Sequence, residues 1–137
     1  IQEHTSVPIM AVVKANGYGH GFIPVTQAAE EAGVSWFGVA RPRMAVKMRE
    51  KDIKSNILVL GYIAPERIEE MICLDVSLTF WTKEHIHQLE KAAQSCQQKA
   101  RAHLLADSGM GRLGCLPERN PGSGRRPLHG FSNQGRS

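Results

Sequence analysis

Residues 11–21 read Ala-Val-Val-Lys-Ala-Asn-Gly-Tyr-Gly-His-Gly, so that one lysine, Lys14, separates an apolar run from a glycine-rich segment. The run before it, residues 7–13, is apolar almost throughout and predicts a strand buried on both faces. Three glycines at alternate positions follow the lysine and lead into a helical pattern. The amine is therefore expected at the end of a buried strand. Because burial disfavours a charged ammonium, we expect this amine to lose its proton easily and to attack carbonyl carbon.

A lysine at a strand end more often extends into solvent and only terminates an apolar run. Here the ten residues 12–21 resemble the cofactor-lysine segment of the alanine racemase family, in which the lysine of a V-x-K-A-N-x-Y-G-H-G string forms the Schiff base with pyridoxal phosphate. The resemblance implies that Lys14 binds this cofactor and serves as one of two proton-transfer bases. It also implies that Tyr18 hydrogen-bonds the cofactor phosphate, whereas a tyrosine after a strand would otherwise be expected to pack.

Strand-like and helical stretches alternate along the chain. Further strands are predicted at residues 36–40, 56–61, 76–81 and 102–107, and helices at residues 22–32, 42–51, 65–73 and from an N-cap at Thr82 onward. This alternation predicts an α/β protein with repeated βα units on a parallel sheet, and leaves open whether the sheet is open or closed. The resemblance implies a (β/α)8 TIM barrel, which takes about 250 residues. We therefore expect a partial barrel of about five βα units with unpaired edges.

Residues 107–114, Asp-Ser-Gly-Met-Gly-Arg-Leu-Gly, are the second informative segment. Their glycines satisfy the G-x-G-x-x-G pattern of dinucleotide-binding turns, but that pattern should follow a first strand, and this one follows the fifth. The segment instead resembles the D-T/S-G-M-G-R-L-G string of alanine racemases. The resemblance implies that Arg112 contacts the phenolic oxygen of the cofactor and the carboxylate of the substrate. Without the resemblance, Arg112 would be read as a solvated loop residue.

One residue departs from the family pattern. Many members carry a carbamylated lysine two residues before the aspartate of the glycine string, directed at the arginine, and this position is Leu105 here. A leucine cannot orient a guanidinium group. The orientation of Arg112 is therefore expected to come from another group or to be poorer.

Composition excludes several classes of protein. The 137 residues are 42% hydrophobic and 6% aromatic, which is typical of a soluble α/β protein. The longest apolar run, residues 57–63, is too short to span a bilayer. Most of the net charge of +4 lies in residues 118–137, so nucleic-acid binding is not expected. The three cysteines have no metal-like spacing and favour a reduced, cytoplasmic setting without a metal.

The pattern of βα units stops after residue 117. Residues 118–137 are rich in glycine, proline, serine and arginine, and are expected to be disordered. Residues 1–117 are then an incomplete N-terminal barrel domain. We hypothesise that the tail is read from a shifted frame or belongs to a damaged gene. Continuation of the family pattern in another reading frame of the DNA would support this hypothesis, and its absence would end it.

The resemblance implies a fragment of a pyridoxal-phosphate-dependent alanine racemase, an isomerase that interconverts L-alanine and D-alanine and so supplies D-alanine for cell-wall peptidoglycan. The parent is expected to be a homodimer whose partner subunit contributes an opposing tyrosine base from its C-terminal domain. We expect this chain to lack that domain and to be inactive alone. Three alternatives stay open: a racemase for serine or another small amino acid, a non-catalytic pyridoxal-phosphate-binding barrel protein, and a fragment without a biochemical role.

Overall fold

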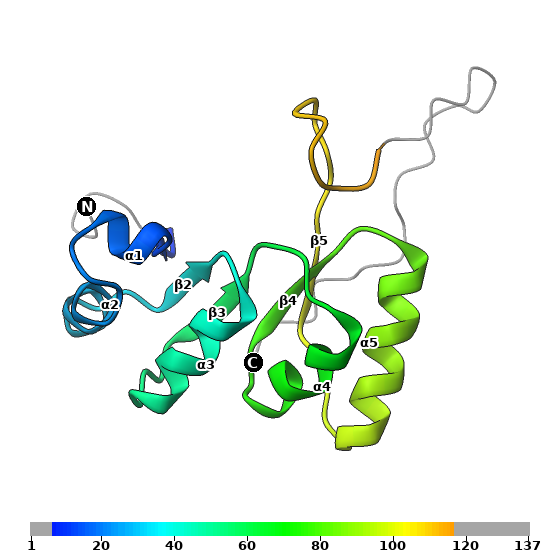
Figure 1. Ribbon diagram of the computed structural model, residues 1–137, viewed down its shortest axis with the longest axis horizontal. Helices are drawn as coiled ribbons and strands as arrows, with labels where there is room; N and C mark the ends of the chain where they lie inside the picture. The colour runs from blue at the N-terminus through cyan, green and yellow to red at the C-terminus, as the bar shows by residue number, and fades with distance from the viewer. Residues whose placement is uncertain (1–6, 117–137) are drawn as a thin grey trace.

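The computed structural model describes residues 7–116 of the chain (Figure 1). The expected domain boundary at residue 117 and the expected disorder of residues 118–137 lie outside the described residues. The strands are β1 (Met10–Val12), β2 (Trp36–Val39), β3 (Asn56–Val59), β4 (Ser77–Phe80) and β5 (Ala102–Leu104). The helices are α1 (Ala15–Tyr18), α2 (Phe22–Glu31), α3 (Pro42–Glu50), α4 (Pro65–Cys73) and α5 (Lys83–Cys96).

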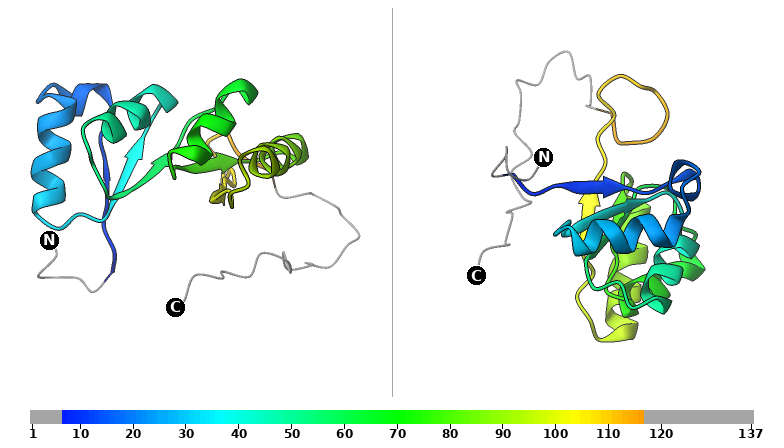
Figure 2. Two further views of the ribbon diagram at one scale, coloured as in Figure 1. Left: turned by 90° about the horizontal axis from the view of Figure 1, so that it is seen from below. Right: turned by 90° about the vertical axis from the view of Figure 1, so that its left-hand side faces the viewer.

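The strands form one parallel sheet whose spatial order, β1-β2-β3-β4-β5, is the order of the chain. Helices α2 to α5 gather along one face of this sheet (Figure 2). A doubly wound dinucleotide-binding sheet reverses its strand order and carries helices on both faces. Sequential order with helices on one side is the winding of a (β/α)8 barrel. The predicted fold class, a partial barrel of about five βα units, is confirmed.

The sheet is curled, as a barrel wall must be. Trp36 of β2 and His103 of β5 lie three strands apart, yet their ring centroids are 5.8 Å apart. Three strand spacings in a flat sheet would separate the backbones by about 14 Å. Gly38 shows the same crowding on the concave face, because a Cβ placed there would lie 3.1 Å from Leu60 Cδ1 and 3.2 Å from Met10 Sδ. The side chains of neighbouring strands therefore converge on the inside of the curve.

The hydrophobic core lies between the convex face of the sheet and the helices. Alternate residues of the central strands face the helices and are buried: Phe37, Val39, Ile57, Val59, Leu78 and Phe80. The helices contribute buried residues at helical spacing: Ala45, Met48, Ile68, Met71, Ile72 and Leu89. The period-2 and period-3.6 patterns of the sequence thus meet in one layer.

The predicted helix starts are confirmed. Pro42 and Pro65 occupy the first turns of α3 and α4, where a missing N–H costs nothing. Thr82 caps α5, since its Oγ1 accepts a hydrogen bond of 3.2 Å from the His85 N–H. No helix in residues 7–116 is long and apolar enough to cross a membrane.

The prediction that residues 7–13 form a strand buried on both faces is wrong in length and burial. Strand β1 spans only Met10–Val12, and Val12 is 37% exposed. The reason is its position at the edge of the sheet, where it pairs with β2 alone and its concave side is uncovered. Strand β5 is the other edge, and it too is shorter than predicted and exposed.

Candidate active site

A left-handed turn connects β1 to α2. Ala15, Asn16, Gly17 and Tyr18 have φ angles of 49°, 55°, 64° and 54°. The N–H of Tyr18 donates to the Lys14 carbonyl at 3.0 Å, which closes the turn immediately behind the lysine. A left-handed conformation costs an L-residue roughly 1–2 kcal/mol, and only one of the four residues is a glycine. Backbone strain of this kind is kept only where the surroundings enforce it.

Asn16 is the residue that enforces the turn. Its Oδ1 accepts a hydrogen bond of 3.0 Å from the N–H of Phe22, the first residue of α2, while its carbonyl accepts one of 3.0 Å from the Gly21 N–H. Phe22 is itself buried in the core. The side chain therefore satisfies a free N–H of the helix start and ties the turn to a fixed element. The direction in which the chain leaves Lys14 is set by these contacts.

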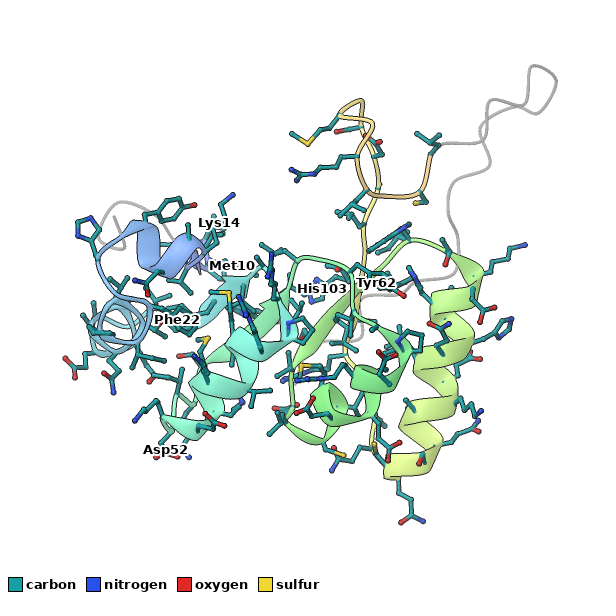
Figure 3. All side chains as sticks on the ribbon, viewed as in Figure 1. Met10, Lys14, Phe22, Asp52, Tyr62 and His103 are labelled. Atoms are coloured by element: carbon teal, nitrogen blue, oxygen red, sulfur yellow. The ribbon has the colours of Figure 1, made fainter. Side chains whose placement is uncertain are left out.

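Lys14 lies directly before the turn, at the carboxyl end of β1 (Figure 3). Its side chain is exposed and has no hydrogen-bond or ion-pair partner within residues 7–116. The expectation that burial in the strand would desolvate this amine is therefore wrong for the described residues, because β1 is an edge strand. Any removal of water from Lys14 has to come from groups that close over it.

Lys14 lines an open groove between the left-handed turn and the start of α3. The groove is bounded by Lys14, Ala15, Asn16, Phe22, Ala40, Arg41, Arg43, Met44 and Lys47. Four of these side chains are cationic, and none of the described lining residues is acidic. The first turn of α3 also carries no acidic residue. Both the cations and the helix N-terminus favour an anionic ligand in this groove.

Sequence reasoning did not single out three of these cations. Arg41 and Arg43 flank Pro42 at the start of α3, and Lys47 follows one turn later. The only signal in the sequence was a local excess of positive charge in residues 41–47, on the helix that follows the strand next to β1. That signal points to a groove only when the parallel pairing of β1 and β2 is known.

The glycine-rich segment after β5 folds around its own aspartate. Asp107 is buried, and its Oδ1 accepts a hydrogen bond of 2.9 Å from the Gly109 N–H. Hydrogen bonds from the backbone of Gly109, then Gly111 and Met110, lower the pKa of Asp107, against an opposing effect of burial. The backbone N–H groups that a dinucleotide-binding turn would offer to a phosphate are thus directed at a carboxylate.

Gly114 closes this loop by a close backbone approach. The Asp107 N–H donates to the Cys115 carbonyl at 3.0 Å, and the Cys115 N–H donates to the Leu105 carbonyl at 2.8 Å. A Cβ at Gly114, whose φ is +126°, would lie 2.6 Å from the Asp107 nitrogen. A glycine is therefore required at position 114 for the loop to close.

Arg112 lies exposed on this loop. Within residues 7–116 its guanidinium group has no hydrogen-bond or ion-pair partner, and Leu105 joins the surrounding hydrogen bonds through its backbone alone. No described side chain takes the place of the family's carbamylated lysine. The roles of Lys14, Tyr18 and Arg112 in binding cofactor and substrate remain predictions.

The structure brings these residues to one end of the sheet but not into contact. Lys14 and Tyr18 belong to one turn after β1, and Tyr18 is 61% exposed. Arg112 follows β5, at the opposite edge of the sheet. Because all strands are parallel, both segments lie at the carboxyl ends of the strands, and Figure 1 shows α1 and the loop after β5 at the same end of the molecule. This is the end at which barrel enzymes carry their active sites.

Comparisons with known proteins agree with the observed fold. The family described as "Alanine racemase, N-terminal domain" matches residues 1–125. An alanine racemase of Desulforamulus reducens is 44% identical over 110 residues, which cover 80% of this chain and 30% of that protein.

Two solved structures share the fold. The alanine racemase from Bacillus anthracis with bound L-Ala-P is 39% identical with a TM-score of 0.73, over 80% of this chain and 28% of that one. A histidine racemase from Leuconostoc mesenteroides subsp. sake is 27% identical with a TM-score of 0.76, over 85% of this chain and 31% of that one. The chain thus spans about 30% of the length of these relatives. By its sequence match and by its sequentially wound parallel sheet, the chain belongs to the alanine racemase family.

Proposed function

We propose that this chain is part of a pyridoxal-phosphate-dependent racemase that interconverts L-alanine and D-alanine, with Lys14 as the residue that bonds the cofactor. One observation carries the proposal. A strained left-handed turn, held by Asn16, places the exposed amine of Lys14 beside a cationic groove at the carboxyl end of the sheet. The family match supplies the chemistry for which such an amine would be placed.

The described residues fit this cofactor. Pyridoxal phosphate combines an aldehyde, an aromatic ring and an anionic phosphate. The groove offers a free primary amine at Lys14, apolar surface from Phe22 and Met44, and positive charge from Arg41 and Arg43. The hydroxyl group of Tyr18, one turn from Lys14, is proposed to hydrogen-bond the phosphate. When bound, the cofactor would supply an electron sink that spreads the charge left at the α-carbon after its proton is removed.

Each residue of the chain has a distinct task in this proposal. Lys14 Nζ would accept and return the α-proton on one face of the substrate. Arg112 would bind the substrate carboxylate, because its planar fork of donors matches two carboxylate oxygens. Asp107 would hold the loop that carries Arg112 through its hydrogen bond to Gly109. We propose that the base for the opposite face lies outside residues 7–116, in the partner subunit of a homodimer.

Alanine is the proposed substrate because alanine racemases match this segment at 44% identity in Desulforamulus reducens and 39% in Bacillus anthracis. The likeness to a histidine racemase supports a second candidate, a racemase of the same fold acting on another amino acid. Neither Lys14 nor Arg112 would distinguish the two, since both act on groups common to all amino acids. We propose that the product, D-alanine, is used for cell-wall peptidoglycan and that the reaction takes place in the cytoplasm.

Absorbance spectroscopy tests the proposal. Addition of pyridoxal phosphate to the purified chain is expected to produce a visible absorption band that the free cofactor lacks. The band should disappear in Lys14→Ala and persist in Lys83→Ala, which removes an exposed lysine from α5. An equal band in the Lys14→Ala chain would contradict the proposal. Racemisation assays of the full-length gene product with L-alanine and L-histidine would then separate the two substrate candidates.

A further inference from the structure

Two cysteines from neighbouring helices lie in contact. Cys73 is the last residue of α4 and Cys96 is the last residue of α5, and their sulfur atoms are 3.2 Å apart. The Cys73 thiol donates to Cys96 Sγ, and the Cys96 thiol donates to the Glu69 carbonyl at 3.6 Å. A disulfide bond is about 2.05 Å long, so an approach of about 1 Å would join the two sulfurs. Both residues are free thiols in this structure.

The two thiols differ in their access to solvent. Cys73 is exposed, whereas Cys96 is half-buried between the helices. Burial, followed by the neighbouring Cys73 thiol and then the Glu69 carboxylate, raises the pKa of Cys96 to about 11. At neutral pH Cys96 is therefore protonated, and an oxidant in solution reaches Cys73 first.

We propose that Cys73 and Cys96 form an oxidisable dithiol, which a small-molecule disulfide converts reversibly into an intramolecular disulfide bond between α4 and α5. The proposal rests on the geometry of these two helices and is independent of the proposed racemase activity. It is also specific for this pair, because the third cysteine, Cys115, lies on the loop after β5.

The oxidation takes place in two exchange steps. The Cys73 thiolate attacks one sulfur of the small-molecule disulfide, forms a mixed disulfide and releases one thiolate. The Cys96 thiol then loses its proton to solvent, and its sulfur attacks Cys73 Sγ. The bond between Cys73 and the small molecule breaks, and a second thiolate leaves. Two protein thiols are oxidised, and one small-molecule disulfide is reduced to two thiols.

The bond would fasten the outer edge of the sheet. Helix α5 leads directly to β5, an edge strand of three exposed residues. A disulfide bond between the carboxyl ends of α4 and α5 would hold β5 to the preceding βα units, which are more deeply buried. These helix ends lie at the amino ends of the strands, away from Lys14. Oxidation is therefore expected to stabilise the fold without changing the reactivity of Lys14.

Peptide mapping of the full chain tests the proposal. The chain is incubated with oxidised glutathione, remaining thiols are blocked with N-ethylmaleimide, and the peptides are analysed without reduction. We expect one cross-linked peptide pair containing Cys73 and Cys96, with Cys115 alkylated, and a rise of roughly 5–15 °C in the midpoint of thermal unfolding. Dithiothreitol should reverse both changes. Cys115→Ser should retain the cross-link, whereas Cys96→Ser should stop at a glutathione adduct on Cys73.

The same reaction in 6 M urea is the control for chain connectivity. Cys73 and Cys96 are 23 positions apart, while Cys96 and Cys115 are 19 apart, so an unfolded chain would close the second loop slightly more readily. Selectivity for Cys73 and Cys96 in buffer, lost in urea, would support the proposal. It would be overturned if both thiols stay fully alkylated with excess oxidant, if pairing in buffer is as unselective as in urea, or if only disulfides between chains form.

Discussion

At the scale of single residues, the site depends on a few backbone positions as much as on its reactive groups. The sequence string predicted correctly that Lys14 follows a strand and precedes a glycine-rich turn. It did not predict the left-handed conformation of Ala15, Asn16 and Tyr18, because alanine and tyrosine rarely adopt a positive φ and the cost is offset by contacts with α2. It also did not predict the exposure of Lys14, since an apolar run is the same in a central strand and in an edge strand.

Replacement of Gly114 by alanine should open the loop that carries Arg112. The new Cβ would lie 2.6 Å from the Asp107 nitrogen and 2.9 Å from the Ala106 carbonyl carbon, at a φ of +126°. Gly109 has a similar φ of +132° but open space around it, so Gly109→Ala carries the backbone strain without the clash. We expect Gly114→Ala to lower the free energy of unfolding by about 2 kcal/mol more than Gly109→Ala does. Urea denaturation measures both, and equal losses would contradict the role of the close approach.

Protonation of Asp107 should release the same loop at low pH. Its pKa lies below the ordinary value of 3.8 because backbone N–H groups hydrogen-bond its ionised form. The folded pKa is depressed, so the stabilisation is complete above the unfolded value and is lost as the pH falls through the folded value. In an NMR titration, the Gly109 amide shift should follow a midpoint below 3.8 and should not titrate in Asp107→Asn. A midpoint above 3.8 would contradict this arrangement.

At the scale of elements, alternation and helix-start residues predicted most of the fold. Helix α4 has the predicted bounds, and the Thr82 cap forms as predicted, because local signals such as proline at a first turn need no tertiary information. The cationic groove was missed for the opposite reason. Its residues come from the turn after β1 and from the start of α3, and only the pairing of β1 with β2 places them together.

Arg49 of α3 joins elements that are distant in sequence. Its guanidinium group donates to four backbone carbonyls: Ile53 at 2.6 Å, Leu74 at 2.9 Å, Ser55 at 3.0 Å and Asp75 at 3.0 Å. These contacts tie α3 to the turn before β3 and to the turn between α4 and β4. Nothing in the sequence distinguished Arg49 from other helical arginines.

Arg49→Ala should therefore destabilise the fold by about 2–4 kcal/mol, because four acceptors lose a charged donor. Glu50→Ala, the neighbouring exposed position on the same helix, is the matched control and should change the stability by less than about 0.5 kcal/mol. Thermal or urea unfolding of both variants checks the expectation. A loss of stability in Arg49→Ala no larger than that in Glu50→Ala would contradict the expectation. It would show that water hydrogen-bonds the four carbonyls as well as Arg49 does.

At the scale of the whole molecule, the sequence alone indicated parallel βα units but could not decide between an open and a closed sheet. The decision comes from strand order, from helices on one face, and from curvature, which are all properties of the assembled sheet. The two exposed edges follow from the same architecture. They explain why strands β1 and β5 are shorter and less buried than their apolar sequences suggested.

The curvature has a direct spectroscopic consequence. Because the rings of Trp36 and His103 are 5.8 Å apart, nuclear Overhauser effects are expected between the indole and imidazole protons. In a flat sheet the two strands would be about 14 Å apart and no such effect would be seen. The control is the effect between backbone protons of β2 and β3, which both shapes share. Its presence without the Trp36–His103 effect would contradict a curled sheet.

The central claim is that the left-handed turn presents the amine of Lys14 to an aldehyde cofactor. Reduction with borohydride in the presence of pyridoxal phosphate, followed by peptide mapping, tests it most directly. We predict that the covalent label falls on the peptide containing Lys14 and that it is lost in Lys14→Ala but kept in Lys47→Ala, which removes another cation of the groove. A label on another lysine, or no label in the chain, would contradict the claim.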